Sequence, residues 1–133
     1  MVGLLIVTHC NLGRELLNAA EFIVGSIDGA DTLSITETTD CDTMRKTIED
    51  KVLALDHGQG VLILTDMFGG TPSNLSLSFL KAKSVEVLTG VNLPMLIAIV
   101  QNRVNANLDE LAEKAQEAGK TGISLAGKLL DFK

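Results

Sequence analysis

The sequence contains no tryptophan and no tyrosine, and its only aromatic side chains are four phenylalanines. Proteins that bind nucleic acid neutralise phosphates with lysine and arginine and often stack bases on aromatic rings. Here 17 acidic residues outnumber 11 lysines and arginines, which gives a formal net charge of −6. The composition therefore argues against a nucleic-acid partner and weakly favours a basic protein partner.

The chain also lacks a long apolar run. Its first apolar stretch, residues 3–8, is too short for a signal peptide and has no charged region before it. No stretch approaches the roughly 20 apolar residues of a membrane span. The two cysteines, Cys10 and Cys41, have no metal-ligand spacing, so we expect reduced thiols, with Cys10 packed or half-buried. These features predict a cytoplasmic protein that does not insert into a membrane.

What the sequence does contain is a regular alternation of strand-like and helix-like segments. At 133 residues with 46% hydrophobic side chains, it is expected to form one domain, residues 1–133. Apolar runs predict strands at 3–8, 31–37, 61–65 and 85–88. Helical periodicity predicts helices at 13–27, 42–55, 72–81, 94–102 and 108–118. In the segment 72–81 apolar residues alternate with serines, as in a strand, but Thr71 as N-cap and Pro72 at the first helical position favour a helix.

Alternating strands and helices predict an α/β fold, an open, doubly wound parallel sheet with helices on both faces. Right-handed crossovers favour the strand order 2-1-3-4, with a switch point between the first and third strands. The segment 121–130 carries Ile123 and Leu125 at strand spacing. It is interpreted as a fifth strand, either at the edge of the sheet or exchanged with a partner subunit.

Two chemically active side chains follow the strands at this switch point. His9 comes directly after the first strand, and Asp66 comes directly after the third. If these strands are neighbours, Asp66 can accept a hydrogen bond from the proton-bearing nitrogen of the imidazole and so fix its tautomer. The other ring nitrogen then has a free lone pair that can attack phosphorus. The alternative is an ordinary strand-end histidine that caps a backbone carbonyl.

Asp66 is followed by a glycine-rich segment, Gly69-Gly70-Thr71. Glycines let the backbone approach a ligand closely, free amides at a helix start suit an anion, and Thr71 adds a hydroxyl donor. The simpler alternative is a strand-to-helix turn. No Gly-Lys-Ser/Thr follows, which argues against nucleotide hydrolysis. The second histidine, His57, follows a predicted helix and is interpreted as its C-terminal cap.

Three segments together resemble the IIA component of the mannose-family sugar phosphotransferase system. They are Ile6-Val7-Thr8-His9, the stretch 64–74 (LTDMFGGTPSN) and the stretch 90–96 (GVNLPML), in the order and spacing of that family. The resemblance implies that His9 is phosphorylated on Nε2 and that Asp66 orients it. It also implies that Gly69, Gly70 and Thr71 hold the phosphoryl oxygens and that Asn92 helps to form the wall of the site.

The same resemblance implies a phosphotransferase. We expect no cofactor, and because the sequence shows no set of metal ligands we expect no resident metal. By the resemblance, the donor would be the phosphocarrier protein HPr, and the acceptor a histidine of a IIB component, which serves sugar uptake through membrane IIC and IID components. Family members are usually homodimers that exchange a C-terminal strand, a place that residues 121–130 could fill.

Several alternatives stay open at this stage. The chain could be a stand-alone regulatory module in which phosphorylation controls partner binding. It could also bind a small phosphorylated ligand, although the scarcity of aromatic residues argues against flavin. A receiver domain with Asp66 as acceptor is disfavoured because His9-Cys10 replaces the expected acidic pair. A zinc site made by Cys10, His9 and Asp66 is disfavoured by their spacing.

Overall fold

Four parallel strands form a single sheet in the computed structural model, which describes residues 1–38 and 40–131. The strand order is β2-β1-β3-β4, as the sequence predicts. The strands are β1 (Gly3–His9), β2 (Ala30–Ile35), β3 (Val61–Thr65) and β4 (Val85–Thr89). The two central strands, β1 and β3, read as continuous apolar runs because helices cover both of their faces.

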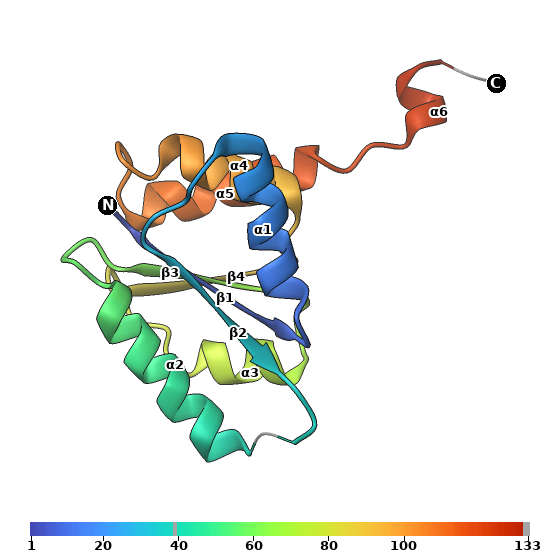
Figure 1. Cartoon of the computed structure of the whole chain (residues 1–133). Helices are drawn as coiled ribbons and strands as arrows, with labels where there is room; N and C mark the ends of the chain where they lie inside the picture. Colours follow the sequence, from blue (N-terminus) through green and yellow to red (C-terminus); the bar gives the residue numbers. More distant parts are fainter. Residues whose placement is uncertain (39, 132–133) are drawn as a thin grey trace.

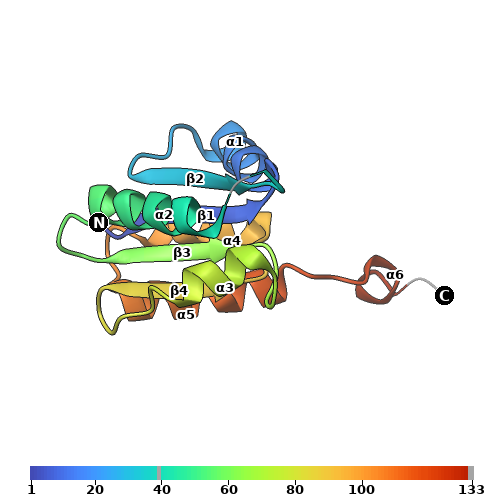
Figure 2. The same ribbon diagram turned by 90° about the horizontal axis from the view of Figure 1, so that it is seen from below.

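The helices form one layer on each side of the sheet (Figures 1 and 2). One layer contains α1 (Leu12–Val24), α4 (Leu93–Asn102) and α5 (Leu108–Thr121). The other contains α2 (Cys41–Leu55) and α3 (Thr71–Leu77). Within the described residues no helix is both long enough and apolar enough to span a bilayer.

The alternation of side chains along β1 divides the core between these two layers. Leu4 and Ile6 pack into the cluster beneath α1, α4 and α5, whereas Leu5 and Val7 pack into the cluster above α2 and α3. All four are at most 1% exposed. The central strand β1 is therefore packed on both faces, which fixes the backbone position of the residue at its carboxyl end.

Several predicted helix ends are wrong. Helix α3 ends at Leu77 instead of residue 81, and α5 extends to Thr121 instead of residue 118. Helix α1 stops at Val24, because the following Gly25 adopts a positive φ of 89° that does not continue a helix. Helix α3 begins one residue early: Gly70 is its N-cap, and the carbonyl of Gly70 accepts the first helical hydrogen bond, from the amide of Asn74. Thr71 is thus inside the helix, and its predicted role as N-cap is wrong.

The C-terminal segment does not add a fifth strand to its own sheet, so the edge-strand alternative is wrong. After α5 the chain leaves the body of the domain and forms only the short helix α6 (Ala126–Leu129), which stands apart in both ribbon views (Figures 1 and 2). Ile123 and Leu125 are 77% and 75% exposed, because none of the helices and strands formed by residues 1–38 and 40–131 covers them. Exchange of this segment with a second subunit stays a prediction.

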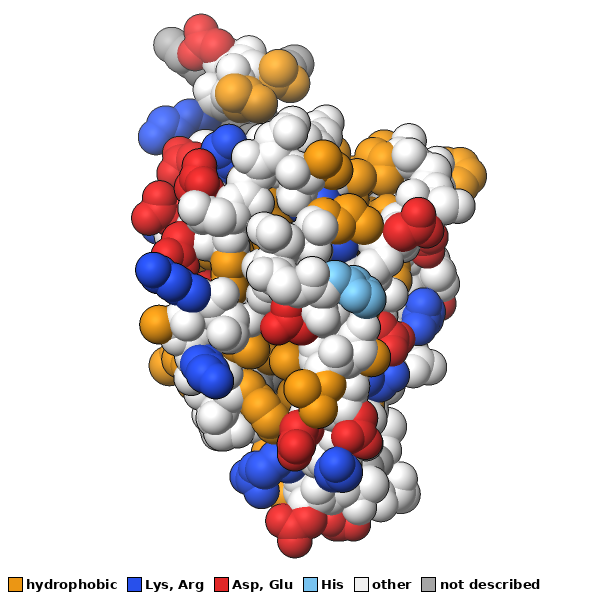
Figure 3. Space-filling view, turned by 90° about the vertical axis from the view of Figure 1, so that its left-hand side faces the viewer, with side chains coloured by type: hydrophobic (Ala, Val, Ile, Leu, Met, Phe, Trp, Pro, Cys, Tyr) orange, Lys and Arg blue, Asp and Glu red, His pale blue; other side chains and the backbone are white. Residues whose placement is uncertain are grey.

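The end of the sheet at which the strands begin lies opposite to the end that carries His9. Figure 3 looks onto the end at which the strands begin, where red and blue side chains are intermingled and orange ones form small separate groups. Such a mixed surface does not create a strong field of one sign.

Arg103 directly follows α4 and makes hydrogen bonds to several segments at this end of the sheet, although it is only 3% exposed. Its guanidinium donates to the carbonyls of Val2, Asp28 and Gly29 at 2.6–3.2 Å. A buried guanidinium is stable only where its donors are satisfied, and here backbone oxygens satisfy them. The side chain thereby joins the start of β1 to the turn that leads into β2.

Replacement of Arg103 by methionine should lower the free energy of unfolding by about 2–4 kcal/mol, since three carbonyls lose buried donors. Urea denaturation of the purified proteins measures this. Arg45→Met, at an exposed ion pair with Asp42, is the matched control and should change stability by less than about 0.5 kcal/mol. Equal midpoints for all three proteins would contradict the assigned role.

Candidate functional site

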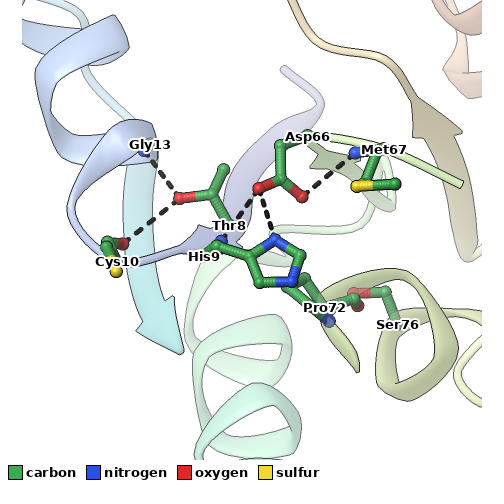
Figure 4. A network of polar contacts seen from close by, with 8 residues as sticks. All are labelled: Thr8, His9, Cys10, Gly13, Asp66, Met67, Pro72 and Ser76. Carbon is green, nitrogen blue, oxygen red and sulfur yellow. Dashed lines mark hydrogen bonds and ion pairs between the residues drawn. The ribbon is translucent and has the colours of Figure 1, made fainter. Parts of the chain in front are cut away.

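His9 and Asp66 meet at the carboxyl edge of the sheet. A single oxygen of Asp66, Oδ2, accepts the backbone N–H of His9 at 2.9 Å and lies 2.8 Å from its ring nitrogen Nδ1. The other carboxylate oxygen accepts the amide of Met67 at 3.0 Å. Figure 4 shows both His9 contacts converging on the same atom. The predicted adjacency of these two side chains, 57 positions apart, is therefore present.

The register of the sheet explains the contact. Val7 of β1 lies opposite Thr65, the last residue of β3. Because β1 continues two residues further, to His9, and Asp66 directly follows β3, the carboxylate reaches across to the end of the neighbouring strand. A shift of the register by one residue would turn the alternating side chains to the opposite face.

The contact determines which ring nitrogen is free. Partial burial raises the pKa of Asp66, but the hydrogen bonds from the backbone and ring of His9 outweigh this and hold the pKa below its ordinary value. The carboxylate is therefore ionised at neutral pH and can only accept hydrogen bonds. In the neutral imidazole the proton then resides on Nδ1, which leaves a lone pair on Nε2.

Gly70 lies against the free edge of this imidazole. A methyl group placed on Gly70 would come within 2.8 Å of Cε1 and 3.2 Å of Nε2 of His9. The φ of Gly70 is −89°, so any residue could adopt this backbone, and glycine is needed here only for space. Gly69, in contrast, has a positive φ of 97° with open space around it, as a turn requires. Thr71 follows directly and is exposed.

Other candidate residues lie in different surroundings. The side chain of Asn92 accepts the amide of Met95 as N-cap of α4 and donates to the carbonyl of Gly119 in α5. These contacts join two helices, so the assignment of Asn92 to the wall of the site stays a prediction. Cys10 is exposed, and its predicted packing is wrong, because the chain turns outward after β1. The cap of α2 is Asp56, not His57, since the helix ends at Leu55.

Among residues 1–38 and 40–131, no three histidine, cysteine or acidic side chains are grouped so that they could hold a metal ion.

The sequence predicted no role for Thr8, the residue directly before His9. Thr8, fully buried, accepts the amide of Gly13 at 2.7 Å. A threonine inside an apolar strand gives no signal of such a contact, because its partner belongs to the next helix.

The fold and the site define a class of protein: an open α/β sheet that presents a histidine, oriented by a carboxylate, at the carboxyl edge of its central strands. The family model described as "PTS system fructose IIA component" (EIIA-man) matches residues 3–116. The chain belongs to this family, the EIIA components of the sugar phosphotransferase system.

Individual relatives agree with this assignment. The chain is 30% identical over 124 residues to the PTS system mannose-specific EIIAB component of Escherichia coli K12, covering 92% of this chain and 38% of that protein. It is 29% identical to the sorbose-specific EIIA component of Lacticaseibacillus casei, covering 91% and 90%. The chain thus spans well under half of the mannose-specific protein and nearly all of the sorbose-specific one.

Solved structures share the fold. An EIIA phosphotransferase component from Streptococcus agalactiae superimposes with a TM-score of 0.87 at 27% identity, covering 96% of this chain and 99% of that one. A PTS IIA protein associated with the fucose utilization operon of Streptococcus pneumoniae gives 0.83 at 30% identity, covering 98% and 99%.

Gly70→Ala should push the imidazole away from its present place, because its methyl group would overlap the ring. We expect the ¹⁵N resonances of His9 to shift and the hydrogen bond to Asp66 to weaken, at a cost of about 1 kcal/mol. Ring ¹⁵N NMR measures the first effect. Gly127→Ala, with open space around it, is the control and should leave the ring unchanged. Unaltered His9 resonances in Gly70→Ala would show that the ring does not depend on this glycine.

Proposed function

We propose that this chain is a histidine phosphocarrier of the phosphoenolpyruvate-dependent phosphotransferase system. His9 accepts a phosphoryl group on Nε2 from phosphorylated HPr and passes it to a histidine of a IIB component. The observation that carries the proposal is the contact of Nδ1 with Asp66, which leaves Nε2 as the nucleophile.

The transfer needs few groups. The Nε2 lone pair forms the new N–P bond as the N–P bond of the donor histidine breaks, and the electron pair of that bond returns to the donor ring. The Nδ1 proton stays in place, so the phosphorylated ring carries positive charge, which the ionised Asp66 stabilises. Such a transfer depends mainly on positioning and on charge stabilisation.

Groups around Nε2 are suited to the phosphoryl oxygens. Gly70 leaves room beside Nε2 because it has no side chain. Thr71, the next residue along the chain, contributes an exposed hydroxyl, and Gly69 has the positive φ of a turn directly before Gly70. We assign the phosphoryl oxygens to the amides and hydroxyl of this loop.

The site is open enough for another protein to reach it. The His9 side chain is 48% exposed. Three large apolar side chains that closely follow His9 or Asp66 in the sequence are also exposed: Leu12 by 47%, Met67 by 55% and Phe68 by 72%. Exposed apolar groups around a polar centre are typical of protein contact surfaces. This supports protein histidines, rather than a small enclosed ligand, as donor and acceptor.

Relatives named for mannose, sorbose and fructose share this domain. We therefore place the choice of sugar in other components of the system.

The test is phosphorylation with phosphoenolpyruvate, enzyme I and HPr. The protein should gain one acid-labile, base-stable phosphoryl group, assigned to His9 Nε2 by NMR. His9→Ala should gain none. His57→Ala, which removes the other histidine, is the matched control and should be labelled like the unaltered protein. Label on His9→Ala, or none on the unaltered protein, would refute the proposal.

We also propose that the chain is a homodimer in which residues 121–130 of each subunit pair with the sheet of the other subunit. β4 is an edge strand of the sheet, so one side of its backbone is free to pair. Ile123, Leu125, Leu129 and Leu130 are 64–77% exposed, so the described part of their own chain leaves most of each side chain uncovered. A second subunit would supply that cover.

Ile123→Asp combined with Leu125→Asp should convert the dimer into a monomer, because charges would enter the buried surface. Light scattering after size exclusion measures the mass. Val104→Asp, at a residue 74% exposed elsewhere, is the control and should remain dimeric. A monomeric unaltered protein would contradict the exchange.

A further inference from the structure

The first turn of α1 lacks the usual side-chain cap. Its N-cap residue, Asn11, makes no capping hydrogen bond, and its side-chain oxygen instead accepts the hydroxyl of Ser34 in β2 at 2.8 Å. The amides at the start of a helix need acceptors, most of all where they are buried. The buried Gly13 amide is one of these, and Thr8 supplies its acceptor from the preceding strand.

Thr8 makes hydrogen bonds across the turn that directly follows His9. Its side-chain oxygen accepts the Gly13 amide at 2.7 Å, and its hydroxyl lies 3.4 Å from the carbonyl of Cys10, to which it donates a longer bond (Figure 4). Between these points Cys10 adopts a φ of 50°, in the left-handed region that costs a residue with a side chain about 1 kcal/mol. The threonine therefore bonds to both sides of a strained turn.

Packing reinforces these bonds. A methyl group on Gly13 would lie 3.0 Å from a methyl of Ile6 and 3.2 Å from the Thr8 oxygen, so the first turn of α1 rests directly on β1. Thr8 itself is 0% exposed. Its side chain points to the face of the sheet covered by α1, opposite to the neighbouring side chains, and it does not touch the ring of His9.

We infer that Thr8 is a positioning residue for His9: its hydroxyl holds the β1–α1 turn so that the backbone N–H and Nδ1 of His9 both reach one oxygen of Asp66. This inference rests on the proposed phosphocarrier function. It predicts that Thr8 affects the rate of phosphoryl transfer and does not affect binding of the donor. Loss of the hydroxyl would let the turn relax from its left-handed conformation and move the ring from Asp66.

Thr65 provides a matched comparison. It occupies the corresponding place on β3, directly before Asp66, and is equally buried. Its hydroxyl, unlike that of Thr8, has no hydrogen-bond partner within the described part of the chain. Thr65→Val thus removes a buried hydroxyl at the same strand edge without removing a bond.

The experiment compares Thr8→Val with Thr65→Val in the HPr phosphorylation assay and by ¹⁵N NMR of the His9 ring. For Thr8→Val we expect a maximal rate lowered about tenfold or more, an unchanged KM for HPr, and less of the Nδ1-protonated tautomer. Thr65→Val should match the unaltered protein in all three measurements. Thr8→Val with unaltered rate and tautomer, or an equal loss in Thr65→Val, would overturn the inference.

A second pair covers the case in which Thr8→Val does not fold. Thr8→Ser and Thr8→Ala differ only by the hydroxyl oxygen, so serine should keep most of the rate and tautomer that alanine loses. Identical behaviour of the two would equally overturn the inference. The tautomer is measured without any donor, so it tests Thr8 even if the unaltered protein takes no phosphoryl group from HPr, a result that would refute only the proposed function.

Discussion

One carboxylate oxygen of Asp66 accepts a hydrogen bond from the backbone N–H of His9 and another from its ring nitrogen Nδ1. The position and the tautomer of the imidazole both depend on this shared acceptor. The backbone bond holds the end of β1 against the end of β3. The ring bond puts the proton on Nδ1 and leaves Nε2 free. A residue that makes only the second contact would orient the ring but leave its backbone free to move, so the double contact couples the fold directly to the chemistry.

The rest of the domain serves to hold this contact at an open edge. The two central strands are buried by helices on both faces. Their register ends with Val7 opposite Thr65, so the carboxylate of Asp66, which directly follows β3, reaches the backbone and ring of His9. Gly70 supplies space on the free side of the ring, where a side chain would overlap it. The buried strands fix the position of the imidazole, and because the imidazole is half-exposed a partner can reach it. Both are needed if the reacting partners are proteins, because neither donor nor acceptor can enter a closed cavity.

Much of this could be predicted from the amino-acid pattern. The apolar runs and helical stripes determined the strand order, the two helical layers and the place of His9 and Asp66 at the switch point, because burial and right-handed connections leave few arrangements of such segments. The Gly69–Thr71 loop could be recognised from composition. The helix ends at Val24 and Gly70 could not, since each depends on the φ, ψ and hydrogen bonds of one residue.

The sequence by itself thus determined which segments form the buried strands, because hydrophobic periodicity is a local property of the chain, and it predicted that His9 and Asp66 meet at the switch point. Only the tertiary structure decided that one Asp66 oxygen accepts two bonds, that Asn92 joins α4 to α5, and that Thr8 caps a helix from the preceding strand. These contacts link residues from 5 to 57 positions apart, and they depend on distances of a few tenths of an ångström that only packing sets.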